Sequence, residues 1–223
     1  MHRMGILGGT FDPIHVGHLE AATIARRTLK LDELLVMPSM TPPHRQPQPH
    51  ASAFHRFAMV ALAVADRDGL MASDEELQSE GPSYTSETLA RLHARGVAPT
   101  EIFFVLGSDA FNDITAWHRY PNVLDAANFV VVTRPGTTLS DIRGRVPELT
   151  PRLIDAAALP TSSNGSPRIV VLQATTPDVS STEIRRRVAA GESLTGLTSS
   201  AVIRHIARHG LYRVHSRAMS DET

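Results

Sequence analysis

The chain has 223 residues, of which 42% are hydrophobic and 20% charged, values typical of a globular protein large enough for one α/β domain with a full core. Its 22 lysines and arginines against 23 aspartates and glutamates give a formal net charge of -1, which argues against holding nucleic acid by bulk electrostatics. The absence of cysteine excludes disulfides and thiolate zinc sites, and no apolar stretch is long enough for a membrane span. The apolar run 4–7 is too short for a signal peptide, so we expect a cytoplasmic enzyme; the sequence leaves open whether it forms a homo-oligomer.

Short apolar runs along the chain predict the strands of a buried parallel sheet. Helical segments separate them, and glycine, proline or polar residues follow most of them. We expect strands at residues 3–8, 34–38, 71–77, 102–106, 129–133 and 169–172.

Helix patterns fill the intervals between these strands. We expect helices at residues 17–30, 52–68, 83–95, about 108–117, 122–127, 180–190 and 199–209, with 138–158 helical but broken. In the helix 52–68, capped by Ser52, the predicted apolar face contains Phe54, Phe57, Ala58, Ala61, Leu62 and Ala65.

The alternation of strands and helices predicts one doubly wound, Rossmann-like α/β domain, with a parallel sheet covered by helices on both faces. We place this domain at residues 1–212 and expect the polar residues 213–223 to be a disordered tail. Residues 39–50 contain four prolines and predict an exposed functional loop. In such sheets ligands bind at the carboxyl ends of the strands.

Residues 8–18 read GGTFDPIHVGH and follow the first predicted strand. Because glycine has no Cβ, Gly8 and Gly9 let the backbone approach a ligand closely and permit a positive φ. The two glycines are adjacent, so the G-x-G-x-x-G spacing of dinucleotide-binding folds is not met.

His15 and His18 stand one turn apart at the start of the next helix, with Gly17 between them. The N-terminus of a helix favours anions, and two imidazoles beside it can donate hydrogen bonds to phosphate. A lone histidine at such a place is more often a solvated residue or a cap. A metal site is the rival interpretation, but it needs a third ligand, and His44 is not a compelling one.

Residues 180–185, SSTEIR, form a second anion-binding pattern far along the chain. Ser181 and Thr182 place hydroxyls at a helix N-terminus, and Arg185 follows one turn later. An ordinary helix cap explains the serines but not the three consecutive arginines that begin at Arg185.

These motifs resemble a known family. The His-x-Gly-His at residues 15–18 resembles the signature of the nucleotidyltransferase α/β superfamily, and the whole of 8–18 resembles bacterial nicotinate-nucleotide adenylyltransferases within it. The resemblance extends in order along nearly the whole chain, through TPPHR at 41–45, GPSYTSETL at 81–89, GSDA at 107–110 with Trp117, RPG at 134–136 and SSTEIR at 180–185.

The resemblance implies transfer of AMP from ATP to nicotinate mononucleotide, which gives deamido-NAD and pyrophosphate in NAD biosynthesis. This is in-line attack on the α-phosphorus of ATP without a covalent enzyme intermediate, so catalysis rests on positioning and charge stabilisation. Mg²⁺ is then expected, carried mainly by the ATP phosphates and water. No cluster of Asp or Glu in the sequence suggests a dedicated metal site.

The resemblance also implies roles for single residues. His18, His15 and Arg45 are the expected catalytic residues, with His18 stabilising the transition state. ATP is expected to be bound by Gly8, Gly9, Thr10, His15, Gly17, His18, Gly107, Asp109, Ser181, Thr182 and Arg185. The mononucleotide is expected to be bound by Thr10, Tyr84, Thr85, Trp117 and Arg134, with Trp117 stacking on the pyridine ring.

Two positions depart from the family pattern. Arg45 stands where the family usually has lysine, which puts its share in catalysis in doubt, and the loop 160–168 is longer than expected. The near alternatives are an adenylyltransferase for phosphopantetheine or for nicotinamide mononucleotide; the more distant ones are a silent nucleotide-binding protein and an NAD-dependent oxidoreductase. The intact His15, His18 and Arg185 argue against the silent protein, and the absent glycine fingerprint argues against the oxidoreductase.

Overall fold

The structure is a computed structural model, and it describes residues 2–43, 48–79, 81–133, 137–160 and 165–213. The strands of these residues form one parallel sheet in the order β3-β2-β1-β4-β5-β7-β6. The strands are β1 Met4–Gly9, β2 Glu33–Pro38, β3 Leu70–Ala72, β4 Ile102–Gly107, β5 Asn128–Thr133, β6 Leu153–Asp155 and β7 Ile169–Gln173.

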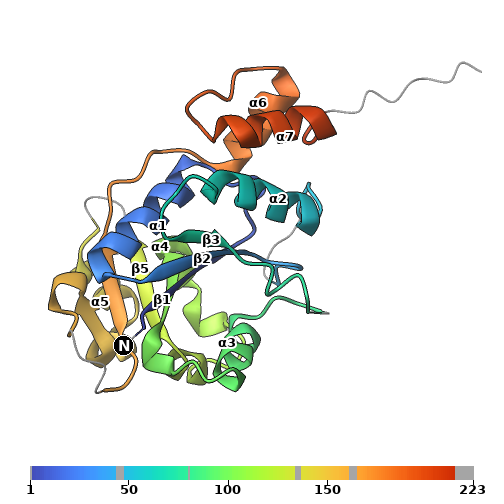
Figure 1. The fold of residues 1–223 in the computed structure, drawn as a ribbon. Coiled ribbons are helices and arrows are strands. Elements are labelled where there is room, and N and C mark those ends of the chain that lie inside the picture. The colour runs from blue at the N-terminus through green and yellow to red at the C-terminus, as the bar shows by residue number, and fades with distance from the viewer. Residues whose placement is uncertain (1, 44–47, 80, 134–136, 161–164, 214–223) are drawn as a thin grey trace, which may run out of the picture.

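Helices connect the strands and cover the sheet (Figure 1). They are α1 Val16–Leu29, α2 Ala53–Val64, α3 Thr85–Ala94, α4 Ser108–Asn112, α5 Leu139–Arg145, α6 Ser181–Ala190 and α7 Ser200–His209. Serine hydroxyls cap three of them, at Ser52, Ser180 and Ser199, by accepting a hydrogen bond from a backbone amide three residues later. The described residues contain no helix long and apolar enough to cross a bilayer.

Alternating side chains of the strands build two separate cores, one on each face of the sheet. Leu7 and Val105 pack with α1, α2, α6 and α7. Ile6 and Phe104 point to the opposite face, where α3, α5 and the segments after β4 cover them. Burial on both faces explains why the strands are almost continuously apolar. The predicted doubly wound α/β fold is therefore confirmed.

α2 turns a different face to the core from the one that we predicted. It buries Arg56, Met59, Val60 and other residues at helical spacing, whereas Phe54 is 68% exposed and Leu62 39% exposed. The prediction was wrong because it kept the only charged residue of the helix out of the core. Arg56 is buried nevertheless, because its guanidinium finds backbone partners there.

Three predicted elements also have different bounds. The predicted helix 108–117 ends at Asn112 and is followed by a 3-10 helix, Ile114–Ala116. The segment predicted as broken helix, 138–158, contains the edge strand β6, which pairs with β7 for three residues only. The strand predicted at 71–77 is β3, Leu70–Ala72. These short pieces are set by tertiary pairing rather than by local periodicity.

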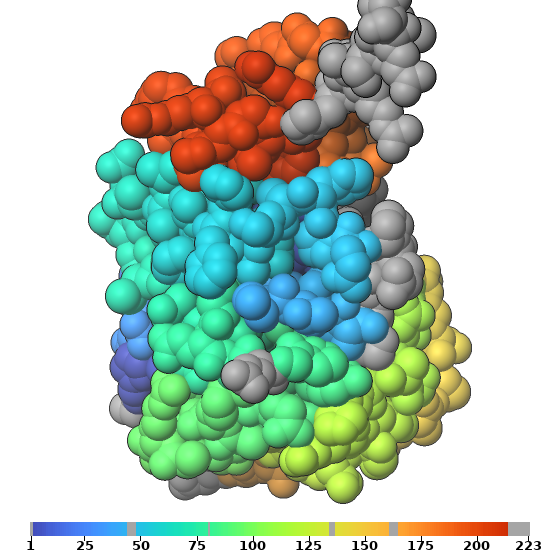
Figure 2. Space-filling model, turned by 90° about the vertical axis from the view of Figure 1, so that its right-hand side faces the viewer, coloured from blue at the N-terminus to red at the C-terminus, as the bar shows by residue number. Residues whose placement is uncertain are grey.

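The order of the strands places a switch point between β1 and β4. From β1 the chain passes to β2 and β3 on one side of the sheet, and then to β4 and β5 on the other. Helices on either side of such a point diverge and leave a crevice at the carboxyl ends of the strands. α7, red in Figure 2, packs on α2, and α6 lies next to α7 in Figure 1. Of the tail predicted for 213–223, only Arg213 belongs to the described residues.

Candidate active site

The turn after β1 depends on its glycines for close packing. A Cβ on Gly8 would lie 2.9 Å from the Phe104 ring, and one on Gly9 would lie 2.9 Å from the ring of Phe11. Neither glycine adopts a positive φ; Phe11 does, with φ 49°. In the structure the two glycines make room for phenylalanine rings, and the left-handed conformation belongs to Phe11, which is buried. Such strain persists only where surrounding contacts impose it.

Two buried charged residues hold this turn, and sequence reasoning assigned a role to neither. The carboxylate of Asp12, 2% exposed, accepts hydrogen bonds from the amides of His50 and Ala51 at 2.8 and 3.1 Å. Arg56, 1% exposed, donates to the carbonyls of Thr10 and Ser39 at 2.7 Å each. The turn is thus fastened to both ends of the proline-rich loop 39–50.

His15 and His18 lie at the start of α1 as predicted, and their rings stack with centroids 3.6 Å apart. The backbone amide of His15 donates to Nδ1 of His18 at 3.3 Å. Gly17 gives the His15 ring room, since a Cβ there would stand 3.1 Å from Nδ1 of His15. The first amide of the helix, that of Val16, donates to the carbonyl of Leu197 and is not left for a ligand.

His15 is a neutral hydrogen-bonding group at physiological pH. The residue is 7% exposed, and burial lowers its pKa to about 4. Among the described residues, its Nδ1 has no hydrogen-bond partner. A buried polar nitrogen without a partner is costly, so this atom is suited to a ligand.

α6 faces the same turn through its first residues. The hydroxyl of Ser181 donates to the carbonyl of Pro13 at 2.8 Å. Arg185 donates to the carbonyl of Asp12 at 2.7 Å and to the hydroxyl of Thr182 at 3.2 Å. The structure thus brings together the two anion-binding patterns of the sequence, which lie more than 160 positions apart.

The two arginines after Arg185 do not join this group. Arg186 pairs with Glu183 and Glu192, and Arg187 pairs with Glu183. These ion pairs are solvent-exposed, on α6 or just beyond its end, where such pairs add little stability. The three consecutive arginines therefore do not act as a unit.

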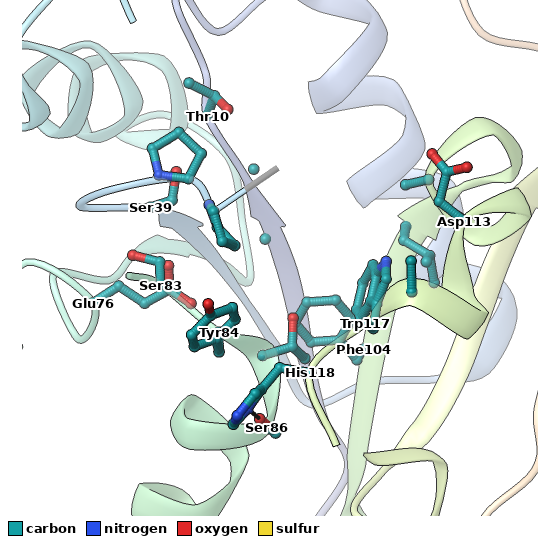
Figure 3. A pocket seen from close by; sticks show the side chains of 18 residues that line it. Thr10, Ser39, Glu76, Ser83, Tyr84, Ser86, Phe104, Asp113, Trp117 and His118 are labelled. Carbon is teal, nitrogen blue, oxygen red and sulfur yellow. Dashed lines mark hydrogen bonds between the residues drawn. The ribbon is translucent and has the colours of Figure 1, made fainter. Parts of the chain in front are cut away.

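A cavity of about 370 Å³ opens on one side of the turn (Figure 3). Figure 3 shows Thr10 and Ser39 at one end, Tyr84, His118 and Ser86 at the other, and Trp117 with Phe104 along a wall. The rings of Trp117 and Phe104 meet edge to face, with centroids 6.1 Å apart. The backbone of Trp117 is extended, directly after the 3-10 helix, and this break presents the indole to the cavity.

The far end of this cavity is closed by contacts between α3 and the segment 117–119. The hydroxyl of Ser86 and Nδ1 of His118 are hydrogen-bonded at 2.9 Å. Tyr84 stacks on His118 with centroids 4.4 Å apart, and Glu87 pairs with Arg119 at 2.9 Å. The predicted Tyr84 and Thr85 therefore line the same cavity as Trp117. The part played by His118 was not predicted.

The cavity also contains two buried polar groups for which the sequence predicted no specific role. The Ser39 hydroxyl has no hydrogen-bond partner among the described residues, which suits it to a ligand. Burial raises the pKa of Glu76, whose carboxyl accepts a hydrogen bond from Thr88 at 2.8 Å. Ser39 follows directly after β2, and that position was the one signal available in the sequence.

A second cavity, of about 210 Å³, lies on the other side of the turn. It is lined by His15, Gly17 and His18 from α1, and by Gly107 and Asp109 from the end of β4 and the start of α4. Leu106 lines both cavities, so they are neighbours across the end of β4. Of the predicted ATP residues, this cavity contains His15, Gly17, His18, Gly107 and Asp109. Gly8, Gly9 and Thr10 line the first cavity instead, and Ser181, Thr182 and Arg185 line neither.

Two predicted site residues, Arg45 and Arg134, lie outside the described residues. Over the described part of the chain, no three His, Cys, Asp or Glu side chains are grouped so as to hold a metal ion. His44, the third ligand considered for a metal site with His15 and His18, also lies outside the described residues.

Comparison with known proteins gives a consistent result. The sequence pattern of the cytidylyltransferase-like family matches residues 6–187. A protein of Pseudomonas fluorescens, named a probable nicotinate-nucleotide adenylyltransferase, is 39% identical over 214 residues, which cover 95% of this chain and 97% of that protein. One of Symbiobacterium thermophilum with the same name is 40% identical, over 95% and 96% of the two chains.

Solved structures agree on the fold. The nicotinic acid mononucleotide adenylyltransferase of Plasmodium falciparum, complexed with APC, superimposes with a TM-score of 0.69 at 16% identity, over 95% of this chain and 98% of that one. The same enzyme complexed with NaAD gives 0.70.

Proposed function

This chain belongs to the nicotinate-nucleotide adenylyltransferases, and we propose that its two adjoining cavities carry the transfer of AMP from ATP to nicotinate mononucleotide. The products are deamido-NAD and pyrophosphate, in NAD biosynthesis. The observation that supports this placement is the meeting of the two cavities at residues 8–18, where one is walled by aromatic rings and the other by the start of α1. A cytoplasmic location, where ATP is at hand, is part of the same proposal.

The aromatic cavity takes the mononucleotide. The indole of Trp117 offers a flat apolar surface for the pyridine ring, with Tyr84 and Thr85 at the far end. Thr10 and the unpaired hydroxyl of Ser39 lie at the end beside the turn, and they suit the ribose and phosphate. The mononucleotide then points its phosphate toward the second cavity. Arg134 is proposed to bind the same substrate.

The second cavity takes ATP. Gly107 and Asp109 are proposed to bind the ribose, and His15, Gly17 and His18 the phosphates, because all five line this cavity. The start of α6 contacts the turn at Asp12 and Pro13. Its residues Ser181, Thr182 and Arg185 suit the β- and γ-phosphates. Gly8, Gly9 and Thr10 form the floor on which the two substrates meet.

The chemistry is a displacement at the α-phosphorus of ATP. A phosphate oxygen of the mononucleotide forms the new P–O bond, and the bond to the β-phosphate breaks, so that pyrophosphate leaves with the electron pair. No protein nucleophile is needed. His18 is proposed to donate to the α-phosphate as negative charge builds up there, while His15 contributes a neutral imidazole. Arg45 is proposed to join them from the proline-rich loop.

Mg²⁺ is proposed as the metal that accompanies ATP. The described residues that line the second cavity offer imidazoles, hydroxyls and a single carboxylate, that of Asp109, rather than a carboxylate cage, which fits an ion held by the phosphates and water. When bound, the ion would neutralise charge on the phosphates.

A pyrophosphate-release assay with Mg-ATP and either nicotinate or nicotinamide mononucleotide tests the proposal. We expect turnover with the acid and less with the amide. Phosphopantetheine, the substrate class of the other near relatives, should give none. Absence of turnover with both pyridine mononucleotides at millimolar concentrations would overturn the proposed function. Faster turnover with the amide would keep the reaction but change its substrate.

A further inference from the structure

Tyr212 reaches the phosphate-binding turn from the far end of the chain. α7 ends at His209, and Tyr212 follows after one turn, with φ 63°. Its hydroxyl donates to Oδ1 of Asp12 at 2.8 Å, across 200 positions of sequence. A positive φ is unfavourable for tyrosine, so the surrounding contacts must impose this conformation.

The carboxylate that Tyr212 contacts is buried and has several donors. Oδ2 of Asp12 accepts from the amide of His50, and Oδ1 accepts from the amide of Ala51 as well as from Tyr212. Tyr212 thus adds a hydrogen bond from a side chain to the two that come from backbone amides. A buried carboxylate that loses a donor attracts the nearest cation more strongly.

Two arginines, Arg56 and Arg185, are the cations to consider near the Asp12 carboxylate. Arg56 already donates to the backbone carbonyls of Thr10, Ala51, Ser39 and Met40. Arg185 is less committed: its Nη1 lies 3.9 Å from Oδ2 of Asp12, beyond hydrogen-bond distance, while it donates at 2.7 Å to the backbone carbonyl of the same residue. A small rotation of its guanidinium would bring it onto the carboxylate.

We propose that Tyr212 is a positioning residue for ATP: by satisfying the Asp12 carboxylate, its hydroxyl keeps Arg185 directed at the β- and γ-phosphates. This inference rests on the proposed function, because it takes Arg185 as a phosphate ligand. Asp12 and ATP compete for one guanidinium, and Tyr212 biases that competition toward ATP. Burial and the Asp12 carboxylate raise the pKa of Tyr212, so the hydroxyl stays protonated and donates throughout the physiological pH range.

Tyr212→Phe removes the hydroxyl and keeps the ring. We expect the KM for ATP to rise about tenfold, as for loss of one charge-assisted phosphate contact, with the KM for nicotinate mononucleotide within about twofold of the wild type. Steady-state kinetics measure both, and calorimetric titration with a non-hydrolysable ATP analogue measures the binding directly. Tyr120→Phe is the matched control, because Tyr120 packs on the opposite face of the sheet.

The double variant Asp12→Asn/Tyr212→Phe distinguishes two explanations for weaker ATP binding: capture of Arg185 by the Asp12 carboxylate, and loss of packing around Tyr212. A neutral amide no longer attracts Arg185, so the double variant should bind ATP more tightly than Tyr212→Phe alone. Weaker binding would overturn the competition, since lost packing alone predicts it. If the double variant does not fold, the comparison of Tyr212→Phe with Tyr120→Phe still decides.

An unchanged KM for ATP in Tyr212→Phe, or an equal rise in both KM values, would overturn the inference. Wild-type turnover in the same assay keeps such a failure distinct from a failure of the proposed function.

Discussion

The two cavities beside β1 are held in shape by different kinds of contact. Around residues 8–18 the supports are hydrogen bonds from distant segments, made by the buried Asp12 and Arg56 and by Arg185. Around Trp117 the supports are ring contacts with Phe104 and Phe129. Directional bonds fix atoms to fractions of an ångström, as a reacting phosphate requires, whereas apolar surfaces tolerate small shifts. Substitution of Arg56 or His18 should therefore lower stability or kcat, whereas substitution of Trp117 should raise the KM for the mononucleotide.

Arg56→Met should have the largest effect. It leaves the carbonyls of Thr10, Ser39 and Met40 buried without this donor, so we expect the free energy of unfolding to fall by about 3–5 kcal/mol in urea denaturation. Arg208→Met, on the exposed side of α7, is the control and should stay within about 0.5 kcal/mol. A loss below about 1 kcal/mol for Arg56→Met would mean that the turn does not depend on these bonds.

The free energy of unfolding should fall in acid because His15 is buried in its neutral form. Burial lowers its pKa from 6.5 to about 4, so below pH 6.5 the unfolded chain takes up a proton that the folded chain does not. Stability is then unaffected above pH 7 and falls between about pH 6.5 and 4, by roughly 3 kcal/mol in all. The difference in unfolding free energy between the wild type and His15→Gln across this range isolates His15, since other groups such as His205 titrate in both proteins. A constant difference would contradict the assignment.

His18→Ala tests the chemistry on the phosphate side. Loss of one preorganised donor to the α-phosphate should lower kcat by about 10²-fold, or roughly 2.7 kcal/mol in the barrier. The exposed His2, changed to alanine, is the matched control. Steady-state turnover close to the wild type would remove His18 from the mechanism.

Trp117→Ala should have the smallest effect, and the effect should appear in a KM rather than in kcat. Stacking of the pyridine ring is lost, so we expect the KM for nicotinate mononucleotide to rise about tenfold, with the KM for ATP nearly unchanged. The KM for ATP serves as the internal control, and a melting curve checks the loss of ring contacts in the core. An effect confined to ATP would reverse the assignment of the two cavities.

Much of this arrangement could be predicted from the sequence, because its elements carry local signals. The buried strands and the helix start at His15 follow from apolar runs and from a motif. Arg56 could not be assigned, since its partners are carbonyls whose positions depend on the complete fold. The contact between Asp12 and Tyr212 joins residues 200 positions apart, and no local pattern encodes it. β6 was missed because three residues at a sheet edge carry no period of their own.

The turn at residues 8–18 receives its last contacts from the most distant part of the chain. The hydroxyl of Ser181 reaches Pro13 across 168 positions, and that of Tyr212 reaches Asp12 across 200. During synthesis residues 8–18 leave the ribosome well before Ser181 and Tyr212, which contact them. A nascent chain that lacks α6 and the residues after α7 has the histidines of the turn but not the hydrogen bonds from Ser181 and Tyr212 that hold the turn in place. On the proposed function, the ability to hold ATP is therefore acquired only after α6 and α7 have been synthesised.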